Sequence, residues 1–442
     1  MTRQYFGTDG IRGTVGEEPL TAEFALRLAS AAARVLSPNG GTVAIGKDTR
    51  VSGYMFESAL EAGFVAAGMD VLLLGPLPTP GIAYLTRSLG ADLGVVISAS
   101  HNPFQDNGIK FFDRQGRKLS DEIERAIEAK LTEPAITRPS ELLGRARRID
   151  NSRTQYQWFA LSTVPPEMRL DGMKIAIDGS NGAGYKVAPR VLSELGADVV
   201  PIGCSPNGKN INLDCGSTHP ELLQATVKGV GADVGIALDG DGDRLVMVDH
   251  NGALIDGDQL LYVLATVRNQ QGTLSGPVVG TLMSNLGLEK SLTERGIKFL
   301  RADVGDRYVL EMLHEHDGIL GGETSGHLLC LDKTTTGDGL VSALQVLTVL
   351  RETGKTLAEL AAGMPRYPQT LVNVRVKTRP DLDAAPIRDA VRAVEDQLGD
   401  RGRVVLRASG TEPVIRVMVE GDDESEVGQV ADRIADAVRS AA

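Results

Sequence analysis

The sequence predicts three related α/β units with mixed, mainly parallel sheets around a cleft, plus a small C-terminal α+β domain. Three observations support this fold class. A β-α-β-α-β order of strand-like and helix-like segments occurs three times along the chain. Each occurrence has a glycine-rich polar turn after a late strand. From about residue 368 the pattern changes to strands of alternating polarity and two amphipathic helices.

The composition is that of a globular protein with several domains. The chain has 442 residues, of which 42% are apolar and 24% charged, and about 100–200 residues per domain is usual. The net charge of −12 argues against a general nucleic-acid or anionic-membrane partner. A site for an anion must therefore be a local basic patch.

The cysteines and the N-terminus bear on localisation. Cys204, Cys215 and Cys330 lack the close spacing of a metal-binding pair, which indicates reduced thiols. The N-terminus has no apolar signal region, and no stretch approaches the roughly 20 apolar residues of a spanning helix. These features predict a soluble cytoplasmic protein without a membrane partner.

The first unit opens with the glycine-rich segment Phe6–Gly13, which contains Arg12, and later has a hairpin carrying Lys110. Thr21 is a suitable N-cap for its first helix. The polar segment 133–156 is expected to be irregular and to contain a domain boundary. We expect helices over 21–36, 54–67, 81–89 and 120–131, and strands over 42–46, 70–74, 94–97 and 106–112.

The second and third units repeat this order. The turn at 179–184 lacks both the GKS/T ending of a phosphate-binding loop and the GxGxxG spacing of a dinucleotide site. For the second unit we expect strands over 173–178, 198–202 and, as its last strand, 233–238, with helices over 186–195 and 220–229. For the third unit we expect strands over 277–282, 298–301 and just before 322, with helices from 306 and over 336–352.

The C-terminal part has a different pattern. Its last helix places Val427, Val430, Ile434 and Val438 on one face. We expect strands over 370–377, 403–406 and 414–419 and a helix over 382–398. The predicted domains are 1–155, 156–257, 258–367 and 368–442.

The turn Ser98–Pro103 follows a buried strand, where open α/β sheets place their chemistry. Ser100 is the best candidate for a nucleophile or phosphate carrier, with His101 and Asn102 able to orient a phosphate. A phosphoserine there would bring about −1.5 to −2 charges and three acceptor oxygens. A Ser-His-Asp hydrolase is a weaker alternative, because the GxSxG turn is absent.

Three aspartates, Asp239, Asp241 and Asp243, follow another predicted buried strand. Hard cations such as Mg²⁺ prefer carboxylate and phosphate oxygens, and the three charges would repel each other without a cation. An EF-hand loop is excluded because His250 stands where that loop needs glutamate. Arg244 is expected to pair with these carboxylates or to reach a phosphate.

Two further turns are candidates for ligand binding. Alternation predicts that Glu323, Ser325 and His327 lie on one side of an extended segment, which suits a polyhydroxylated ligand such as a sugar. His327 is also a candidate acid or base. Glycine, hydroxyl and arginine groups suit an anion in the C-terminal part, where the candidates are Arg407, Ser409, Gly410, Thr411 and Arg416.

Several motifs in order make the chain similar to the α-D-phosphohexomutase family, of which it is identified as a member. The resemblance covers essentially the whole length, most closely to members that act on glucosamine phosphates. The motifs are FGTDGIRG at 6–13, GKDTRVSG at 46–53, ISASHNP at 97–103, DGDGDR at 239–244, GETSGH at 322–327, TTTGDG at 334–339 and SGTEPVIRVMVE at 409–420.

The resemblance implies four domains around a central cleft and a phosphorylated Ser100. It implies one Mg²⁺ per subunit, held by Ser100's phosphate and the three aspartates. The 322–327 turn would hold the sugar, and the C-terminal loop its non-transferring phosphate. Arg12 and Lys110 would add positive charge, with Lys110 or His327 as the acid or base.

The implied reaction interconverts glucosamine 6-phosphate and glucosamine 1-phosphate, for UDP-N-acetylglucosamine and the bacterial cell wall. A sugar 1,6-bisphosphate would be its intermediate and activator. Glucose or mannose phosphate as substrate, a metal-dependent phosphatase and a non-catalytic sensor stay as alternatives. The oligomeric state stays open, with a homodimer as one option. Ala408 and Asp303 depart from residues found in relatives, without touching the serine or aspartate motifs.

Overall fold

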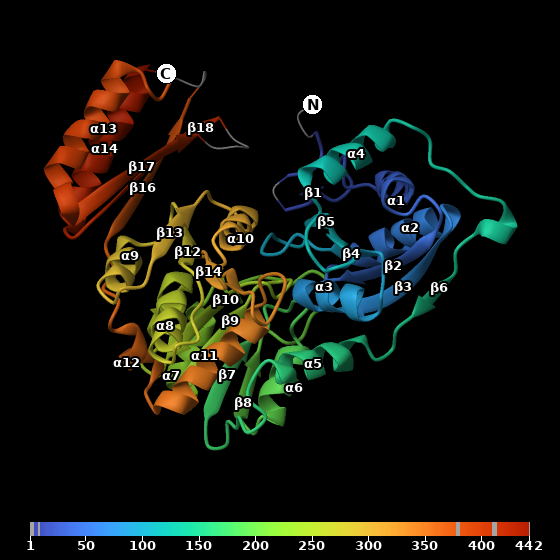
Figure 1. Ribbon diagram of the computed structural model, residues 1–442, viewed down its shortest axis with the longest axis horizontal. Helices are drawn as coiled ribbons and strands as arrows, with labels where there is room; N and C mark the ends of the chain where they lie inside the picture. Colours follow the sequence, from blue (N-terminus) through green and yellow to red (C-terminus); the bar gives the residue numbers. More distant parts are fainter. Residues whose placement is uncertain (1–3, 8, 377–380, 409–412, 442) are drawn as a thin grey trace.

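The computed structural model describes residues 4–7, 9–376, 381–408 and 413–441, and contains four β-sheets of six, five, four and three strands. Each sheet belongs to one of four consecutive units of the chain. The first and fourth units lie at opposite ends of the arrangement, with the second and third between them (Figure 1). The predicted fold class is confirmed.

The first unit has a six-stranded mixed sheet in the order β1-β5-β4-β2-β3-β6. Strands β4, β2, β3 and β6 are parallel, and β5 returns antiparallel to β4. Its strands are β1 (Ile11–Thr14), β2 (Gly41–Lys47), β3 (Met69–Pro76), β4 (Leu93–Ile97), β5 (Asp106–Asp113) and β6 (Ala146–Arg148). Its helices are α1 (Ala22–Leu36), α2 (Gly53–Ala66), α3 (Thr79–Ser88) and α4 (Asp121–Leu131).

Local sequence explains most of these elements. The Thr21 hydroxyl accepts a hydrogen bond from Phe24 N at 3.2 Å and caps α1, as predicted. The prediction that 133–156 is irregular is wrong in part. Ala146–Arg148 forms a short edge strand that pairs with β3. Ser152 already begins the next helix.

The second unit has the strand order β11-β10-β9-β7-β8. The prediction that 233–238 is its last strand is wrong. The chain turns back after the aspartate turn, and β10 and β11 extend the sheet antiparallel to β9. The elements are α5 (Ser152–Ser162), β7 (Lys174–Asp178), α6 (Val187–Glu194), β8 (Asp198–Ile202), α7 (Glu221–Val230), β9 (Val234–Leu238), β10 (Leu245–Asp249) and β11 (Leu254–Ile255).

The third unit has the strand order β13-β12-β14-β15, and only β15 is antiparallel to its neighbour. The sequence analysis did not predict α8, since all residues from 257 to 268 are buried and no polar face marks the helix. The elements are α8 (Gly257–Gln270), β12 (Val278–Thr281), α9 (Leu286–Thr293), β13 (Phe299–Ala302), α10 (Asp306–Glu315), β14 (Leu320–Gly322), β15 (Leu328–Cys330), α11 (Gly339–Thr353) and α12 (Leu357–Ala361).

The fourth unit is an antiparallel sheet, β16-β18-β17, covered by two helices that pack on each other and on the strands. Its helices lie together on one side of the sheet in Figure 1. The elements are β16 (Gln369–Arg375), α13 (Ala385–Leu398), β17 (Gly402–Ala408), β18 (Val414–Gly421) and α14 (Glu424–Ala441).

The hydrophobic core joins the first three units but not the fourth. One continuous cluster runs from Ala44 in β2 through Tyr156 in α5 to Met364 after α12. The fourth unit has its own cluster, built from its sheet and from α13 and α14. The first three units are therefore joined by one apolar cluster, although the first has a second cluster of its own, and the fourth packs around a separate interior.

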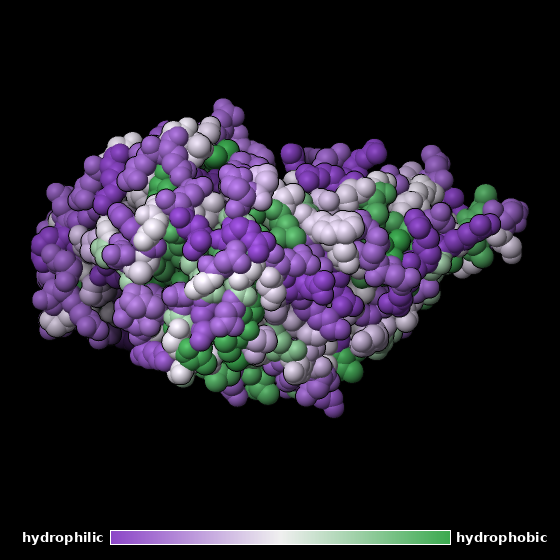
Figure 2. Space-filling view, turned by 90° about the horizontal axis from the view of Figure 1, so that it is seen from below, coloured by the Kyte–Doolittle hydropathy of each residue, from purple (hydrophilic) through white to green (hydrophobic). Residues whose placement is uncertain are grey.

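The surface carries no described helix that is long and apolar enough to cross a membrane. Figure 2 shows a face on which hydrophilic residues predominate, with hydrophobic residues in small groups between them. The three cysteines are free thiols, as predicted. Burial raises the pKa of Cys330 to about 11, so this thiol stays protonated at neutral pH.

Tyr156→Phe is expected to destabilise the fold. The buried Tyr156 hydroxyl donates to both carboxylate oxygens of Asp338 at 2.9 Å, joining α5 to the N-terminus of α11. Removing a donor from a buried carboxyl group costs about 1–3 kcal/mol. The check is the midpoint of thermal unfolding, with Tyr84→Phe as control because the ring of Tyr84 stacks on Phe159. Equal midpoints for both variants would contradict this role.

Candidate active site

Ser100 lies in a tight turn directly after β4 and is 1% exposed. Its φ of 51° is unusual for a residue other than glycine, and such strain concentrates at functional sites. The turn is held from two sides. Arg50 Nη2 and Asn212 Nδ2, from the first and second units, each donate to Ser100 O at 2.9 Å. The backbone around the hydroxyl is therefore fixed before any ligand binds.

The aspartate turn after β9 meets the serine turn. Ser100 Oγ donates a hydrogen bond to Asp239 Oδ2 at 2.6 Å. A Cβ atom at Gly240 would lie 2.6 Å from Ser100 O, so this close approach requires glycine. The structure thus brings the predicted nucleophile and the predicted metal ligands together across two units.

The three aspartates fit a divalent cation. Each offers a carboxylate oxygen within 4.8 Å of the others, and all three side chains are buried. Within the described part of the chain, the buried atoms Asp241 Oδ1 and Asp243 Oδ1 have no hydrogen-bond partner. A set of oxygens alone suits hard cations such as Mg²⁺ rather than soft ones.

The charges of the aspartates are compensated unequally. Burial and the neighbouring carboxylates of Asp243 and Asp241 raise the pKa of Asp239 well above its usual value. Burial also raises the pKa of Asp241, but Lys110, whose Nζ is 2.9 Å from Asp241 Oδ2, outweighs it and lowers that pKa. Thr79 Oγ1, at the start of α3, donates to the same oxygen at 2.7 Å. Thr79 was not among the predicted site residues.

Asp9 is a second residue that the sequence analysis missed. It forms ion pairs with Arg12, with Lys110 at 2.9 Å and with Lys118 at 2.6 Å. Lys110 and Arg12, both predicted, are therefore held side by side despite their like charges. Asp9 stands within the 6–13 motif, but the spacing of that motif says nothing about which cations fold onto it.

Lys118 links the first and third units. Its Nζ lies 2.6 Å from Asp306 Oδ2 at the start of α10. Arg307 strengthens this contact, because it donates to Leu119 O at 3.1 Å and pairs with Asp121 on the first unit. Neither Lys118 nor Asp306 was predicted, since residues 188 positions apart give no local signal.

The turn at 322–327 connects β14 to β15. The prediction of an extended segment is wrong, because Gly326 N donates to Glu323 O at 2.9 Å and closes a tight turn. Gly326 has a φ of +91°, which glycine tolerates. Glu323 and His327 line the cavity beside Ser100, whereas Ser325 is exposed.

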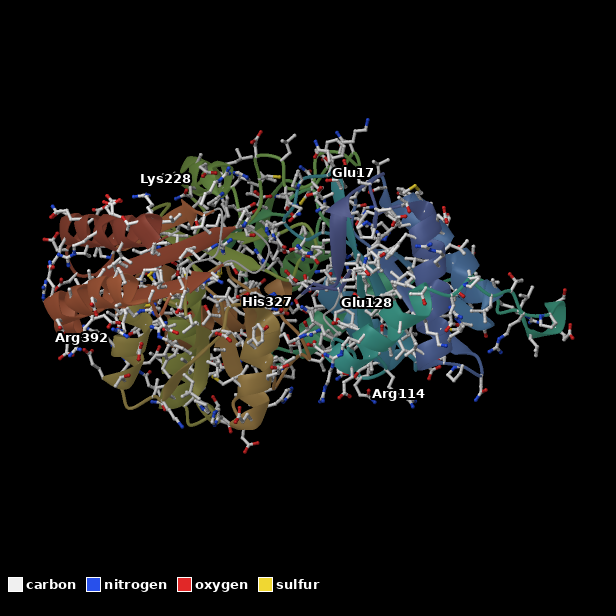
Figure 3. The ribbon with its side chains drawn as sticks, turned by 90° about the horizontal axis from the view of Figure 1, so that it is seen from above. Glu17, Arg114, Glu128, Lys228, His327 and Arg392 are labelled. Carbon is white, nitrogen blue, oxygen red and sulfur yellow. The ribbon has the colours of Figure 1, made fainter. Side chains whose placement is uncertain are left out.

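His327 lies between two carboxylates, with Nδ1 3.6 Å from Asp243 and Nε2 3.4 Å from Asp306. Figure 3 places it near the centre of the molecule, where the first and third units meet. Burial lowers its pKa, but the negative charges of Asp243, Asp306 and Glu323 outweigh burial and raise it to about 9. The imidazole is therefore protonated at neutral pH in the metal-free protein.

The pKa of His101 is shifted in the opposite direction from that of His327. Burial and the positive charges of Arg244 and Arg12 lower its pKa to about 4. Its Nδ1 is 3.4 Å from Ser100 Oγ. A neutral imidazole can orient a hydroxyl or a phosphate through either ring nitrogen, depending on the tautomer.

These side chains surround a cavity of about 660 Å³, a size usual for small-molecule sites. Residues of the first three units line it, and its wall carries both cations and carboxylates. The lining includes Asp9, Arg12, Ser100, Lys118, Asp243, Arg244, Asp306, Glu323 and His327.

Of the predicted anion-binding residues of the fourth unit, Arg407 and Arg416 lie outside that lining. Arg407 in β17 pairs directly with Arg416 in β18, so both side chains are on one face of the sheet. Burial and the neighbouring Arg416 lower the pKa of Arg407, and Asp303 of the third unit acts against this change. Ser409, Gly410 and Thr411 lie outside the described residues.

The chain matches family models along most of its length. The models are described as phosphoglucomutase/phosphomannomutase, alpha/beta/alpha domain I for residues 3–136, domain II for 160–252, domain III for 256–367 and C-terminal domain for 371–437.

Curated relatives match over the full length. The chain is 59% identical to a phosphoglucosamine mutase of Alkalilimnicola ehrlichii, covering 100% of this chain and 98% of that protein. It is 58% identical to a phosphoglucosamine mutase of Thioalkalivibrio sulfidiphilus, covering 100% and 99%. A crystal structure of a phosphoglucomutase/phosphomannomutase family protein from Burkholderia thailandensis matches with a TM-score of 0.82, 25% identity and 100% and 98% coverage.

An Aspergillus fumigatus N-acetylphosphoglucosamine mutase, solved with GlcNAc-6P and magnesium, has a TM-score of 0.71 and 18% identity. The alignment covers 100% of this chain and 96% of that one. At this identity the likeness shows the shared fold.

The titration of His327 is a test of the charge arrangement. In the metal-free protein its imidazole should titrate near pH 9, and NMR of the imidazole, assigned with His327→Gln, measures this. The folded pKa exceeds the usual 6.5, so the folded state holds an extra proton between these values. The contribution of His327 to stability is thus complete below pH 6.5 and lost as the pH rises to about 9. Titration near 6.5 would contradict the arrangement.

Proposed function

The chain belongs to the phosphoglucomutase/phosphomannomutase family, and we propose that it is an isomerase that interconverts glucosamine 6-phosphate and glucosamine 1-phosphate. The observation that carries this proposal is the Ser100 hydroxyl, 2.6 Å from Asp239 in a cavity lined by cations. The choice of glucosamine phosphate is supported by full-length identities of 57–59% to phosphoglucosamine mutases.

The proposed reaction starts from phosphorylated Ser100. One hydroxyl of the bound sugar phosphate attacks the phosphorus atom, the bond from phosphorus to Ser100 Oγ breaks, and the sugar 1,6-bisphosphate forms. The bisphosphate turns over in the cleft and returns its other phosphoryl group to Ser100. Each round thus moves a phosphate between the two sugar positions and regenerates the phosphoserine. Added bisphosphate would prime Ser100, which accounts for its role as activator.

Asp239, Asp241 and Asp243 would hold one Mg²⁺ per subunit beside the phosphoserine. The cation supplies charge neutralisation to the phosphoryl group in transfer. Arg12 and Lys110 add fixed positive charge on the same side, because Asp9 keeps both in place.

Proton transfer is assigned to Lys110 or His327, and both stay candidates. The carboxylates of Asp241 and Asp9 outweigh burial and raise the pKa of Lys110, and the pKa of His327 is also raised. Each group is therefore protonated at neutral pH, and each can give a proton to the departing oxygen. His101, which is neutral, orients the phosphoserine, and Arg244 contacts its phosphate.

The sugar and its second phosphate would occupy the other parts of the cleft. Glu323 and Ser325 are proposed to bind the sugar hydroxyls. The non-transferring phosphate would bind Arg407, Ser409, Gly410, Thr411 and Arg416 of the fourth unit. One such anion site must accept either end of the sugar, since the bisphosphate presents both.

We also propose that the protein has four domains, at 1–155, 156–257, 258–367 and 368–442. It would form a homodimer and be located in the cytoplasm. The product is an activated amino sugar phosphate for UDP-N-acetylglucosamine and cell-wall precursors. Membranes and nucleic acids have no part in it.

The direct test is a Mg²⁺-dependent turnover assay with phosphorylated protein and a trace of sugar 1,6-bisphosphate. Glucosamine, glucose and mannose phosphates are compared in parallel. Preference for glucosamine phosphate supports the proposal, and preference for another sugar would replace the substrate. Release of inorganic phosphate without isomerisation would indicate a phosphatase, and binding without turnover a sensor.

Ser100→Ala is expected to lower mutase turnover by at least about 10⁴-fold, because the covalent phosphate carrier is lost. The thermal midpoint should stay within a few degrees. Ser162→Ala, an exposed serine in the second unit, is the matched control and should keep full turnover. Substantial turnover by Ser100→Ala would disprove the assignment.

Arg407→Ala is expected to raise KM about 10–100-fold with a smaller change in kcat, since it removes a charge-assisted contact worth about 1.5–3 kcal/mol. The measurement is steady-state kinetics with glucosamine 6-phosphate. Arg392→Ala, an exposed arginine on α13 labelled in Figure 3, should leave KM unchanged. An unchanged KM for Arg407→Ala would remove this residue from the phosphate site.

A further inference from the structure

The loop 282–286, which joins β12 to α9, makes several hydrogen bonds with the fourth unit. We call these five residues the hinge loop. The fourth unit has a core of its own, so its position depends on polar contacts more than on shared apolar packing. The hinge loop receives hydrogen bonds from the fourth unit on one side and from the 322–327 turn on the other.

On the side of the fourth unit, Glu420 and Arg403 form hydrogen bonds with the backbone of the hinge loop. Glu420 is fully buried, and its Oε1 accepts from Leu286 N at 2.6 Å, at the start of α9. Arg403 pairs with Glu420 at 2.8 Å and donates to Leu282 O at 2.9 Å and Ser284 O at 2.7 Å. These bonds tie β17 and β18 to the backbone of the loop.

Asn285 makes a further contact with the segment that enters the fourth unit. Its Nδ2 donates to Tyr367 O at 2.9 Å, and its Oδ1 accepts from Tyr367 N at 3.1 Å. Tyr367 precedes β16 by two residues. These two bonds join the segment that enters the fourth unit to a side chain of the hinge loop.

On the opposite side, one carboxylate reaches both the hinge loop and the 322–327 turn. Asp258, at the start of α8, is fully buried. Its Oδ2 accepts from Asn285 N at 2.9 Å and from Thr324 Oγ1 at 2.7 Å. Thr324 stands between Glu323 and Ser325 in the turn, and its own carbonyl accepts from Gly257 N at 3.1 Å.

Losing either of the hydrogen bonds that Asp258 accepts, from Asn285 N or from Thr324 Oγ1, is energetically costly. Burial is the main cause that raises the pKa of Asp258, to about 6, so the group is largely ionised at neutral pH. A buried carboxylate that loses one of its donors pays a large desolvation penalty. The 322–327 turn and the hinge loop are consequently held in one geometry relative to each other.

We propose that Asp258 is a positioning residue that couples the 322–327 turn to the fourth unit through the hinge loop. When the fourth unit binds the phosphate of the substrate, the hinge loop moves with Glu420 and Tyr367, and Asp258 transmits that movement to Thr324. The turn that carries Glu323 is thereby positioned against the sugar when the phosphate is bound. This inference rests on the proposed function, since it assumes that both segments contact one sugar phosphate.

The test is hydrogen exchange of the full-length protein with and without glucosamine 6-phosphate. In the unaltered protein the ligand should slow exchange in β17 and β18, in the hinge loop and in the 322–327 turn. Asp258→Ala, which removes the oxygen that accepts both hydrogen bonds, should keep the slowing in β17 and β18 and lose it in the turn. Asp332→Asn, which breaks an ion pair with Arg268 elsewhere in the third unit, is the matched control and should keep both.

Thr324→Val is the second variant, and it carries the test if Asp258→Ala does not fold. It removes one hydroxyl of nearly equal shape and leaves Asp258 in place. Each variant should lower kcat/KM about 5–150-fold, the usual range of coupling between sites. The losses from Asp258→Ala and Glu420→Gln should be non-additive, because both act through the hinge loop.

The outcomes separate the inference from the proposed function. Ligand-induced slowing in the 322–327 turn that persists in Asp258→Ala and Thr324→Val would overturn the coupling and leave the mutase reaction intact. Slowing in the turn but not in the hinge loop of the unaltered protein would do the same. A ligand that slows exchange in none of these segments would overturn the proposed function.

Discussion

The hydrogen bond between Ser100 and Asp239 sets the requirements that the rest of the site meets. It joins the first two units at a point where three carboxylates are buried together. Burying such charges without partners is strongly unfavourable. The surrounding groups supply those partners: Lys110 and Thr79 contact Asp241, and the backbone of Arg244 donates to Asp239. A bound cation would complete this set, because two carboxylate oxygens are left without hydrogen-bond partners among the described residues.

A second principle is that carboxylates hold Arg12, Lys110, Lys118 and His327 in the cleft. Asp9 contacts Arg12, Lys110 and Lys118, and Asp306 contacts Lys118 and His327. These pairs keep positive side chains in fixed positions within a protein of net charge −12. They also join the first unit to the third, since Asp9 and Asp306 share the Lys118 ammonium group. The preorganised charge is what a phosphoryl transfer site needs.

The division of the core gives the fourth unit a distinct role. The first three units are joined by one apolar cluster, which packs beneath the serine and aspartate turns. The fourth unit is attached by hydrogen bonds to the hinge loop, and its arginines lie outside the lining of the cavity. The proposed phosphate site on this separately packed unit would suit the proposed bisphosphate intermediate, which must present either end to Ser100.

The sequence by itself determined the fold class, the serine and aspartate turns and most helices, because capping residues, strand periodicity and glycine spacing are local. It did not determine α8, whose residues are buried on every side, or the tight turn that Gly326 allows at 322–327. Tertiary structure alone revealed the contacts of Asp9, Lys118, Asp306 and Asp258. Each acts on partners far away in the chain, and a long-range ion pair or hydrogen bond leaves no periodic or spacing signal. Local sequence patterns therefore identify the reactive side chains, and the packing of the units determines which charged partners surround them.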